Sequence, residues 1–119
     1  MIGLGADLVE VERIRRALAR TPALRSRLFS PNEQAYAEQH VDPVPSLAAR
    51  FAAKEAVMKA LGIGGLRFRD IEVQRAGSGA PEIVLSGGAR RLQDEAGVTR
   101  WHVSLSHTDS TAMAVVIGQ

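Results

Sequence analysis

The sequence of 119 residues contains no cysteine, few aromatic residues and no long apolar run. The absence of cysteine excludes disulfide bonds and thiolate nucleophiles, and a zinc site would depend on three histidines and on carboxylates. Aromatic residues make up only 4% of the chain, which leaves little material for the stacking surfaces that bind single-stranded nucleic acids. No apolar stretch approaches the roughly 20 residues of a transmembrane helix, so we expect no membrane span.

The residues that are present have the composition of an ordinary globular protein. Apolar residues form 45% of the chain and charged residues 24%, which argues against a disordered or fibrous protein. This length is typical of one domain with one core, so we expect a single domain over residues 1–119. The segment after Met1 is β-like and lacks the basic and apolar regions of a signal peptide. We therefore expect a cytoplasmic protein.

The net charge is small although the isoelectric point is high. Fifteen Lys and Arg residues against 13 Asp and Glu residues give a net charge of +2, whereas the isoelectric point is about 9.7. The titration curve is flat because few groups titrate between pH 7 and 10. Any attraction to an acidic partner must therefore come from local clusters of charge.

Hydrophobic periodicity predicts an α+β fold with a mainly antiparallel sheet. The expected strands cover residues 1–9, 71–73, 82–85, 101–106 and 111–117. The expected helices cover residues 11–20, 46–61 and about 89–96, with a further helix that begins after Ser30. Ser30-Pro31-Asn32-Glu33 has the pattern of a helix capping box. The last strand is apolar on both faces, which is typical of a central strand.

The helix expected over 46–61 combines apolar and charged residues. Its apolar stripe consists of Leu47, Phe51, Met58 and Leu61. Lys54 falls inside this stripe, and Glu55 and Lys59 are spaced as an i,i+4 pair. In one interpretation, Lys54 extends its ammonium to solvent and Glu55–Lys59 is a surface ion pair. In the other, the helix presents one carboxylate and several cations, including Arg50, to a polyanion.

Asp7 lies on the strand face that also carries Gly3 and Gly5. Its carboxylate could stabilise the N-terminus of the following helix through the helix dipole. Alternatively, the glycines leave an open groove beside it. A site with one or two carboxylates and nearby lysines suits Mg²⁺, which keeps several waters and binds substrate phosphates.

The segment Ser104–Thr108 places hydroxyl groups and an imidazole at a strand end. His107 is either a turn residue that bonds to its neighbours or a ligand contact. A catalytic triad of Ser106, His107 and Asp109 is not expected, because adjacent residues in a strand point to opposite faces. The three histidines also lack the spacing of zinc ligands.

Arg13, Arg16 and Arg20 lie on one face of the first helix. Such a row is commonly just solvated. If it has a function, it would dock an acidic surface. Nucleic acid is one candidate, but no aromatic stacking motif accompanies the arginines, and an acidic protein fits at least as well.

Two segments closely resemble the two-part signature of the 4′-phosphopantetheinyl transferases. They are Leu4–Leu8 (LGADL) and Phe51–Ala60 (FAAKEAVMKA). The Gly62–Gly64 loop, the Phe68–Val73 segment and the hairpin from Ser104 to Ile117 are similar to the short, holo-acyl-carrier-protein synthase branch of that family. The resemblance covers nearly the whole chain, and it implies the transferase fold with a long signature helix packed on the antiparallel sheet.

The resemblance implies an enzyme of fatty acid biosynthesis. It would transfer 4′-phosphopantetheine from coenzyme A to a serine hydroxyl of apo-acyl carrier protein and release adenosine 3′,5′-bisphosphate. Attack at phosphorus in a polyanion needs charge neutralisation and in-line positioning more than a protein nucleophile. The general base remains open between Glu55 and a metal-bound water. A nucleic-acid-binding module and a non-catalytic carrier-protein binder are the alternatives.

The same resemblance assigns roles to individual residues. Asp7 and Glu55 would hold Mg²⁺ and, with Lys59, form the catalytic group. The coenzyme contacts would be Arg50, Lys54, Lys59, Gly62, Ser106, His107 and Thr108. Arg13 would contact the acidic helix of the carrier protein, with Arg16 and Arg20 extending that face. Short members of the family are homotrimers with active sites between subunits.

Two segments depart from the family pattern. Asp42–Pro45 stands where many relatives carry basic residues, so we expect weaker contact with the nucleotide there. Asp109-Ser110-Thr111 replaces the usual basic or aromatic residues after the His107-Thr108 pair.

Overall fold

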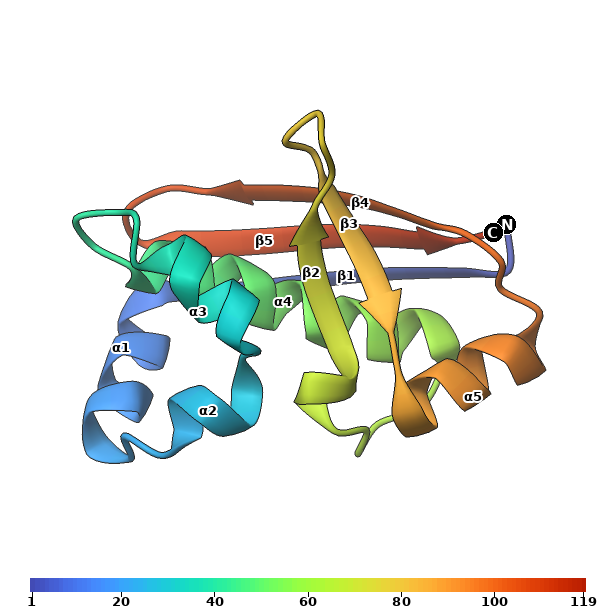
Figure 1. The fold of residues 1–119 in the computed structure, drawn as a ribbon, viewed down its shortest axis with the longest axis horizontal. Coiled ribbons are helices and arrows are strands. Elements are labelled where there is room, and N and C mark those ends of the chain that lie inside the picture. Colours follow the sequence, from blue (N-terminus) through green and yellow to red (C-terminus); the bar gives the residue numbers. More distant parts are fainter.

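Two antiparallel sheets surround one long helix in the computed structural model, which describes residues 1–119 (Figure 1). The larger sheet has the strand order β1-β5-β4. Its strands are β1 (Gly3–Glu10), β5 (Thr111–Gly118) and β4 (Trp101–His107). The smaller sheet is the hairpin of β2 (Ile71–Arg75) and β3 (Pro81–Leu85). The α+β class and the central position of the last strand are therefore confirmed.

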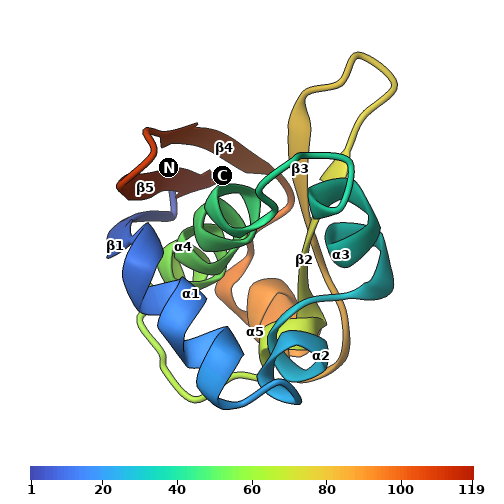
Figure 2. The same cartoon turned by 90° about the vertical axis from the view of Figure 1, so that its left-hand side faces the viewer.

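Helix α4 runs beneath the larger sheet, and the other helices lie around it (Figures 1 and 2). The α-helices are α1 (Val11–Arg20), α2 (Leu24–Leu28), α3 (Pro31–Ala37), α4 (Val44–Leu61) and α5 (Gly87–Ala96). A 3₁₀ helix, η1 (Phe68–Asp70), leads into β2. None of the helices combines the length and apolarity needed to cross a bilayer.

Local sequence signals set several helix ends. Ser30 and Glu33 form the predicted reciprocal capping box at the start of α3. Gly62 ends α4 in the left-handed conformation, with φ of 71°. Helix α4 begins at Val44, two residues before the predicted start, because Pro45 is accommodated in its first turn.

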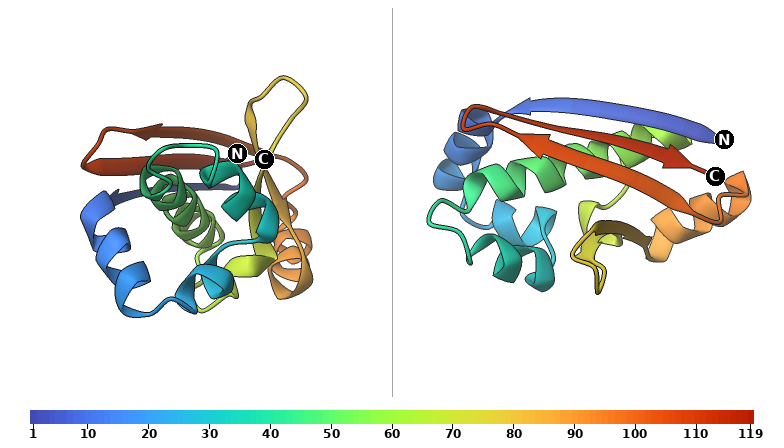
Figure 3. Two further views of the ribbon diagram at one scale, coloured as in Figure 1. Left: turned by 60° about the vertical axis from the view of Figure 1, so that its left-hand side comes forward. Right: turned by 90° about the horizontal axis from the view of Figure 1, so that it is seen from above.

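The prediction of a single apolar stripe on α4 is wrong, because α4 is buried on nearly all sides. Many of its buried residues are alanines, including Ala52, Ala53 and Ala56. Small side chains allow neighbouring backbone to approach closely, and the view from above shows α4 directly under the sheet (Figure 3). Helix α4 is thus the centre of the core, with the larger sheet on one side and α1, α3 and β2 on others.

Gly3 and Gly5 face α4 and bring its backbone against β1. A Cβ atom on Gly5 would overlap the carbonyl oxygen of Ala56, and one on Gly3 would overlap that of Ala60. The open groove expected beside these glycines is therefore absent, because the helix backbone fills it. The two glycines therefore allow the backbones of β1 and α4 to pack closely against each other.

The opposite face of the larger sheet carries exposed apolar side chains. Leu4 and Leu8 of β1 are 56% and 68% exposed, and Met113 of β5 is 40% exposed. Leu8 pairs with Met113 and Leu4 with Ile117, and paired residues project to the same face. This face is an apolar patch of the kind that marks contact with another protein surface.

The close approach predicts that Gly5→Ala destabilises the protein. The added methyl group meets helix backbone, which cannot rotate away, so we expect a loss of about 1–3 kcal/mol in the free energy of unfolding, or failure to fold. Urea denaturation measures the change. Gly88→Ala is the control, because no atom lies within 4 Å of its added Cβ. An equal effect of the two substitutions would contradict the assignment.

Candidate functional site

Asp7 and Lys59 meet where β1 crosses α4. Lys59 Nζ donates to Asp7 Oδ1 and to the backbone oxygen of Ala6, both at 3.0 Å. The Asp7 side chain is 17% exposed and that of Lys59 is 55% exposed. Because Asp7 lies on the glycine face of β1, the close approach at Gly5 brings its carboxylate to α4. The resulting ion pair remains accessible to a ligand.

Glu55 lies one helical turn before Lys59 and makes no hydrogen bond or ion pair in the structure. Glu55 and Lys59 line a cavity of about 370 Å³ together with Gly62–Leu66 and Phe68. Lys59 also lines an adjoining cavity of about 390 Å³ that contains Asp7. The surface pair Glu55–Lys59 that the spacing allows is thus not formed, since Lys59 bonds to Asp7 instead. Lys59 borders both the cavity of Glu55 and the cavity of Asp7.

Lys54 is fully buried and has no access to a ligand. Its Nζ donates to Leu28 O at 2.7 Å, Glu33 Oε1 at 2.7 Å and Phe68 O at 3.1 Å, which uses all three ammonium protons. Burial lowers the pKa of Lys54, and Glu33 partly offsets this shift. Both expectations for Lys54, extension into solvent and contact with the coenzyme, are wrong. Its partner, Glu33, could not be found from the sequence, where the only signal at Glu33 is the capping motif.

Arg50 is a buried guanidinium with free hydrogen-bond donors. Its Nη1 donates to Ser46 Oγ at 2.9 Å, while Nε and Nη2 have no partner. The guanidinium lies 4.4 Å from the ring centre of Tyr36, and that of Arg75 lies 4.5 Å from the same ring. Burial lowers the pKa of Arg50. These two buried, unpaired nitrogens carry three N–H groups, which suit the binding of an anion.

The Arg50 cavity is separate from the Glu55 cavity. It has a volume of about 320 Å³, and Asn32, Tyr36, Gln74 and Arg75 are among its lining residues. The two cavities share no residue. A ligand that touches both groups must therefore be extended, with a negative charge near each.

Ser106, His107 and Thr108 lie at the exposed end of β4. Thr108 Oγ1 accepts from the backbone N–H groups of Ser110 and Thr111 at 3.2 and 3.1 Å, which shapes the turn. His107 Nδ1 lies 3.3 Å from the oxygen of Thr108. Within one copy of the chain, none of the three lines the cavities of Asp7, Glu55 or Arg50.

The arginine row of α1 is exposed and free of ion pairs. Arg13, Arg16 and Arg20 have no acidic partner, whereas Arg15 pairs with Glu12 and Asp42, each at 2.7 Å. Asp42 also accepts from the N–H of Val44, and Arg15 holds the pKa of the Asp42 carboxyl below its usual range. The Asp42 carboxylate therefore links α1 to the start of α4.

The two accessible carboxylates fit magnesium better than zinc. No group of three or more His, Cys, Asp or Glu residues is placed to hold a metal ion. A structural zinc site needs four such ligands, whereas Mg²⁺ binds through one or two carboxylates with waters and substrate phosphates. Asp7 and Glu55 supply a donor set of the second kind.

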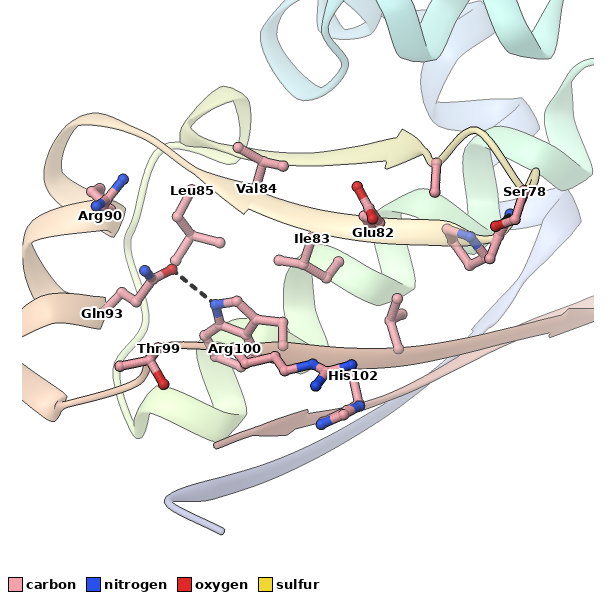
Figure 4. Close-up of a pocket in the computed structure, with 15 residues that line it drawn as sticks. Ser78, Glu82, Ile83, Val84, Leu85, Arg90, Gln93, Thr99, Arg100 and His102 are labelled. Carbon is pink, nitrogen blue, oxygen red and sulfur yellow. Dashed lines mark hydrogen bonds between the residues drawn. The ribbon is translucent and has the colours of Figure 1, made fainter.

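A further cavity of about 530 Å³ lies between β3, β4 and α5 (Figure 4). Trp101 Nε1 donates to Gln93 Oε1 at 2.9 Å in it, and Arg90, Arg100 and His102 are among its lining residues. None of the predicted site residues lines it. It is therefore distinct from the candidate site.

Comparisons with known proteins point to one family. The family model of the 4′-phosphopantetheinyl transferase superfamily matches residues 3–116. A holo-[acyl-carrier-protein] synthase of Moorella thermoacetica is 48% identical over 98% of this chain and 93% of its own. The crystal structure of the synthase from Neisseria meningitidis is similar to this chain, with a TM-score of 0.90 and 33% identity. The match covers 100% of this chain and 98% of the Neisseria chain. The crystal structure of the synthase from Helicobacter pylori in complex with coenzyme A is similar with a TM-score of 0.85 and 32% identity, and the match covers 98% of this chain and 99% of the Helicobacter chain.

Proposed function

The chain belongs to the 4′-phosphopantetheinyl transferase superfamily, and from this premise we propose that it transfers 4′-phosphopantetheine from coenzyme A to a serine of acyl carrier protein. It is an enzyme of the holo-[acyl-carrier-protein] synthase type. The observation that carries the proposal is the Asp7–Lys59 ion pair at the crossing of β1 and α4, beside the cavity that Lys59 lines together with Glu55. All of residues 1–119 would form one transferase domain in the cytoplasm, serving fatty acid biosynthesis.

The proposed reaction exchanges one phosphorus–oxygen bond for another. The serine oxygen attacks the phosphorus that carries the pantetheine arm, the pyrophosphate bond breaks, and adenosine 3′,5′-bisphosphate leaves. Asp7 and Glu55 would hold Mg²⁺, which when bound neutralises the charge of the pyrophosphate. Lys59 adds a cation at the same place. Glu55 has no hydrogen-bond partner and is the protein group that can accept the serine proton.

We assign the nucleotide part of the coenzyme to Arg50 and to the end of β4. The unpaired Nε and Nη2 of Arg50 suit a phosphate group. Gly62 shapes the wall of the Glu55 cavity by turning the chain at the end of α4. Lys54 is left out of the coenzyme contacts, since its ammonium is enclosed. Ser106, His107 and Thr108 would contact the coenzyme from a neighbouring subunit.

A homotrimer with active sites between subunits fits two features of the surface. The apolar patch of Leu4, Leu8 and Met113 needs a covering partner. The end of β4 with His107 also lies outside the cavities of its own chain, so a second copy would complete the site.

The free arginine row of α1 would dock the carrier protein. Arg13, Arg16 and Arg20 project from α1 opposite its buried Ile14 and Leu18. Acidic groups on the carrier would be attracted to this unpaired positive row, which favours fast association more than high affinity.

The transferase proposal predicts a mass gain on apo-acyl carrier protein. Incubation with coenzyme A and Mg²⁺ should add one phosphopantetheine group per carrier, as measured by mass spectrometry, and chelation of Mg²⁺ should abolish it. Asp7→Asn and Glu55→Gln should each slow transfer by about 100-fold or more. Glu95→Gln, which neutralises an exposed carboxylate without a hydrogen bond, is the control. No gain with the wild-type protein, or unchanged rates in the two site variants, would refute the proposal.

The homotrimer predicts a solution mass three times the chain mass of 12.8 kDa. Leu8→Glu should shift the protein toward monomer, since a charge cannot be buried in the apolar patch without cost, and should also slow transfer. Light scattering after size exclusion measures the mass. Val41→Glu introduces the same charge at a fully exposed loop position and should leave the mass unchanged. A monomeric wild-type protein would contradict the assignment.

A further inference from the structure

Glu33 and Lys54 form an ion pair without any access to solvent. Their side chains are both 0% exposed, and Nζ lies 2.7 Å from Oε1. The cost of removing two charges from water can exceed their mutual attraction, and well-packed apolar residues are often equally stable at such positions. Stability alone is therefore a weak reason for this pair.

Lys54 connects three segments that are distant in sequence. Its acceptors are Leu28 at the end of α2, Glu33 in α3 and Phe68 at the start of η1. An ammonium directs three protons tetrahedrally from one compact nitrogen, whereas a guanidinium is larger and spreads its donors over a plane. Three acceptors around one enclosed nitrogen thus fit a lysine better than an arginine.

Glu33 extends the same network to β2. Its Oε1 accepts from Ser30 N at 2.8 Å as well as from Lys54, and its Oε2 accepts from Val73 N at 2.8 Å. Glutamine would offer one oxygen in place of two, so one side of this network would face an amide NH₂ group. A carboxylate is therefore needed at position 33 to satisfy all three donors.

The network reaches the candidate site through Phe68. Phe68 lines the cavity that contains Glu55 and Lys59. Its ring stacks on that of Phe51 in α4, with the two ring centres 5.3 Å apart. At one end of the cavity wall the Ile63 N–H bonds to Met58 O, and at the other end Lys54 bonds to the Phe68 carbonyl. Residues 64–66, which lie between them, make no backbone hydrogen bond. Lys54 therefore fixes one end of the segment 62–68, which forms a wall of the Glu55 cavity.

We propose that Glu33 and Lys54 are positioning residues that set the wall of the Glu55 cavity, a role that rests on the proposed transferase function. They touch no substrate. Lys54 acts through the Phe68 carbonyl on the segment 62–68. Glu33 supplies the countercharge that allows a lysine to stay buried there.

The test compares the double variant Glu33→Gln/Lys54→Met with the wild-type protein. The double variant buries no charge, so it should fold, whereas Lys54→Met alone would leave the Glu33 carboxylate unpaired. Hydrogen exchange should accelerate at least tenfold at Ile63 and Asp70, whose amides are hydrogen-bonded at the two ends of this segment, while β1 and β5 keep wild-type rates. The kcat for transfer should fall about 10- to 100-fold, with an unchanged KM for the carrier protein.

Ile71→Val is the control, because it weakens the core beside the network without removing any of its bonds. It should leave both the exchange of Ile63 and Asp70 and kcat near the wild-type values. If the double variant does not fold, Lys54→Arg replaces it, since it keeps the charge but puts a larger, planar group in place of the ammonium. Wild-type exchange at Ile63 and Asp70, or a kcat loss no larger than that of the control, would overturn the proposal.

The exchange measurement separates this proposal from the proposed function. A wild-type protein without transferase activity would refute the function and leave the exchange of Ile63 and Asp70 as the test of the positioning network. An active enzyme whose double variant keeps wild-type exchange and kcat would refute the positioning role alone.

Discussion

The backbone of α4 lies directly against the backbone of β1, and the candidate site depends on this contact. The contact is possible because Gly3 and Gly5 present no side chain to the helix, where even a methyl group would overlap the carbonyl oxygens of Ala60 and Ala56. Asp7 follows two residues after Gly5 on the same face of β1, so its carboxylate reaches Lys59. With a larger separation between strand and helix, this ion pair could not form.

Two lysines of α4 have different environments because they lie on different sides of the helix. Lys54 and Lys59 are five residues apart, which rotates them by about 140° around the helix axis. Lys54 points into the protein and is enclosed by carbonyl and carboxylate oxygens, whereas Lys59 points to the edge of β1 and stays accessible. The same chemical group thus holds the core together at one position and borders a ligand cavity at the other.

The sequence allowed the main elements to be predicted because their signals are local. The alternation in β1, the Ser30–Glu33 capping box and the two-faced apolar run of β5 each depend on neighbouring residues only. The family signature implied that Lys54 and Lys59 lie near Asp7, and of the two only Lys59 does.

Features that depend on tertiary packing could not be predicted in this way. Glu33 is 21 residues from Lys54, and its capping motif gives no sign of a second partner. Gly3 and Gly5 show that one face of β1 has no side chains. They do not show whether the space beside that face is an open groove or is filled by a helix backbone. The unpaired donors of Arg50 depend on Tyr36 and Ser46 shielding it from water, which hydrophobic periodicity does not describe.

We propose that Asp7 and Glu55, which line the two cavities that share Lys59, hold one divalent cation at the β1–α4 contact. NMR line broadening by Mn²⁺, a paramagnetic ion that also prefers oxygen ligands, tests this assignment when the ion is added in the presence of coenzyme A. Amide signals around Asp7 and Glu55 should broaden first, and Asp7→Asn should remove the effect. Broadening centred on another part of the chain, or unchanged broadening in that variant, would show that these carboxylates do not hold the cation.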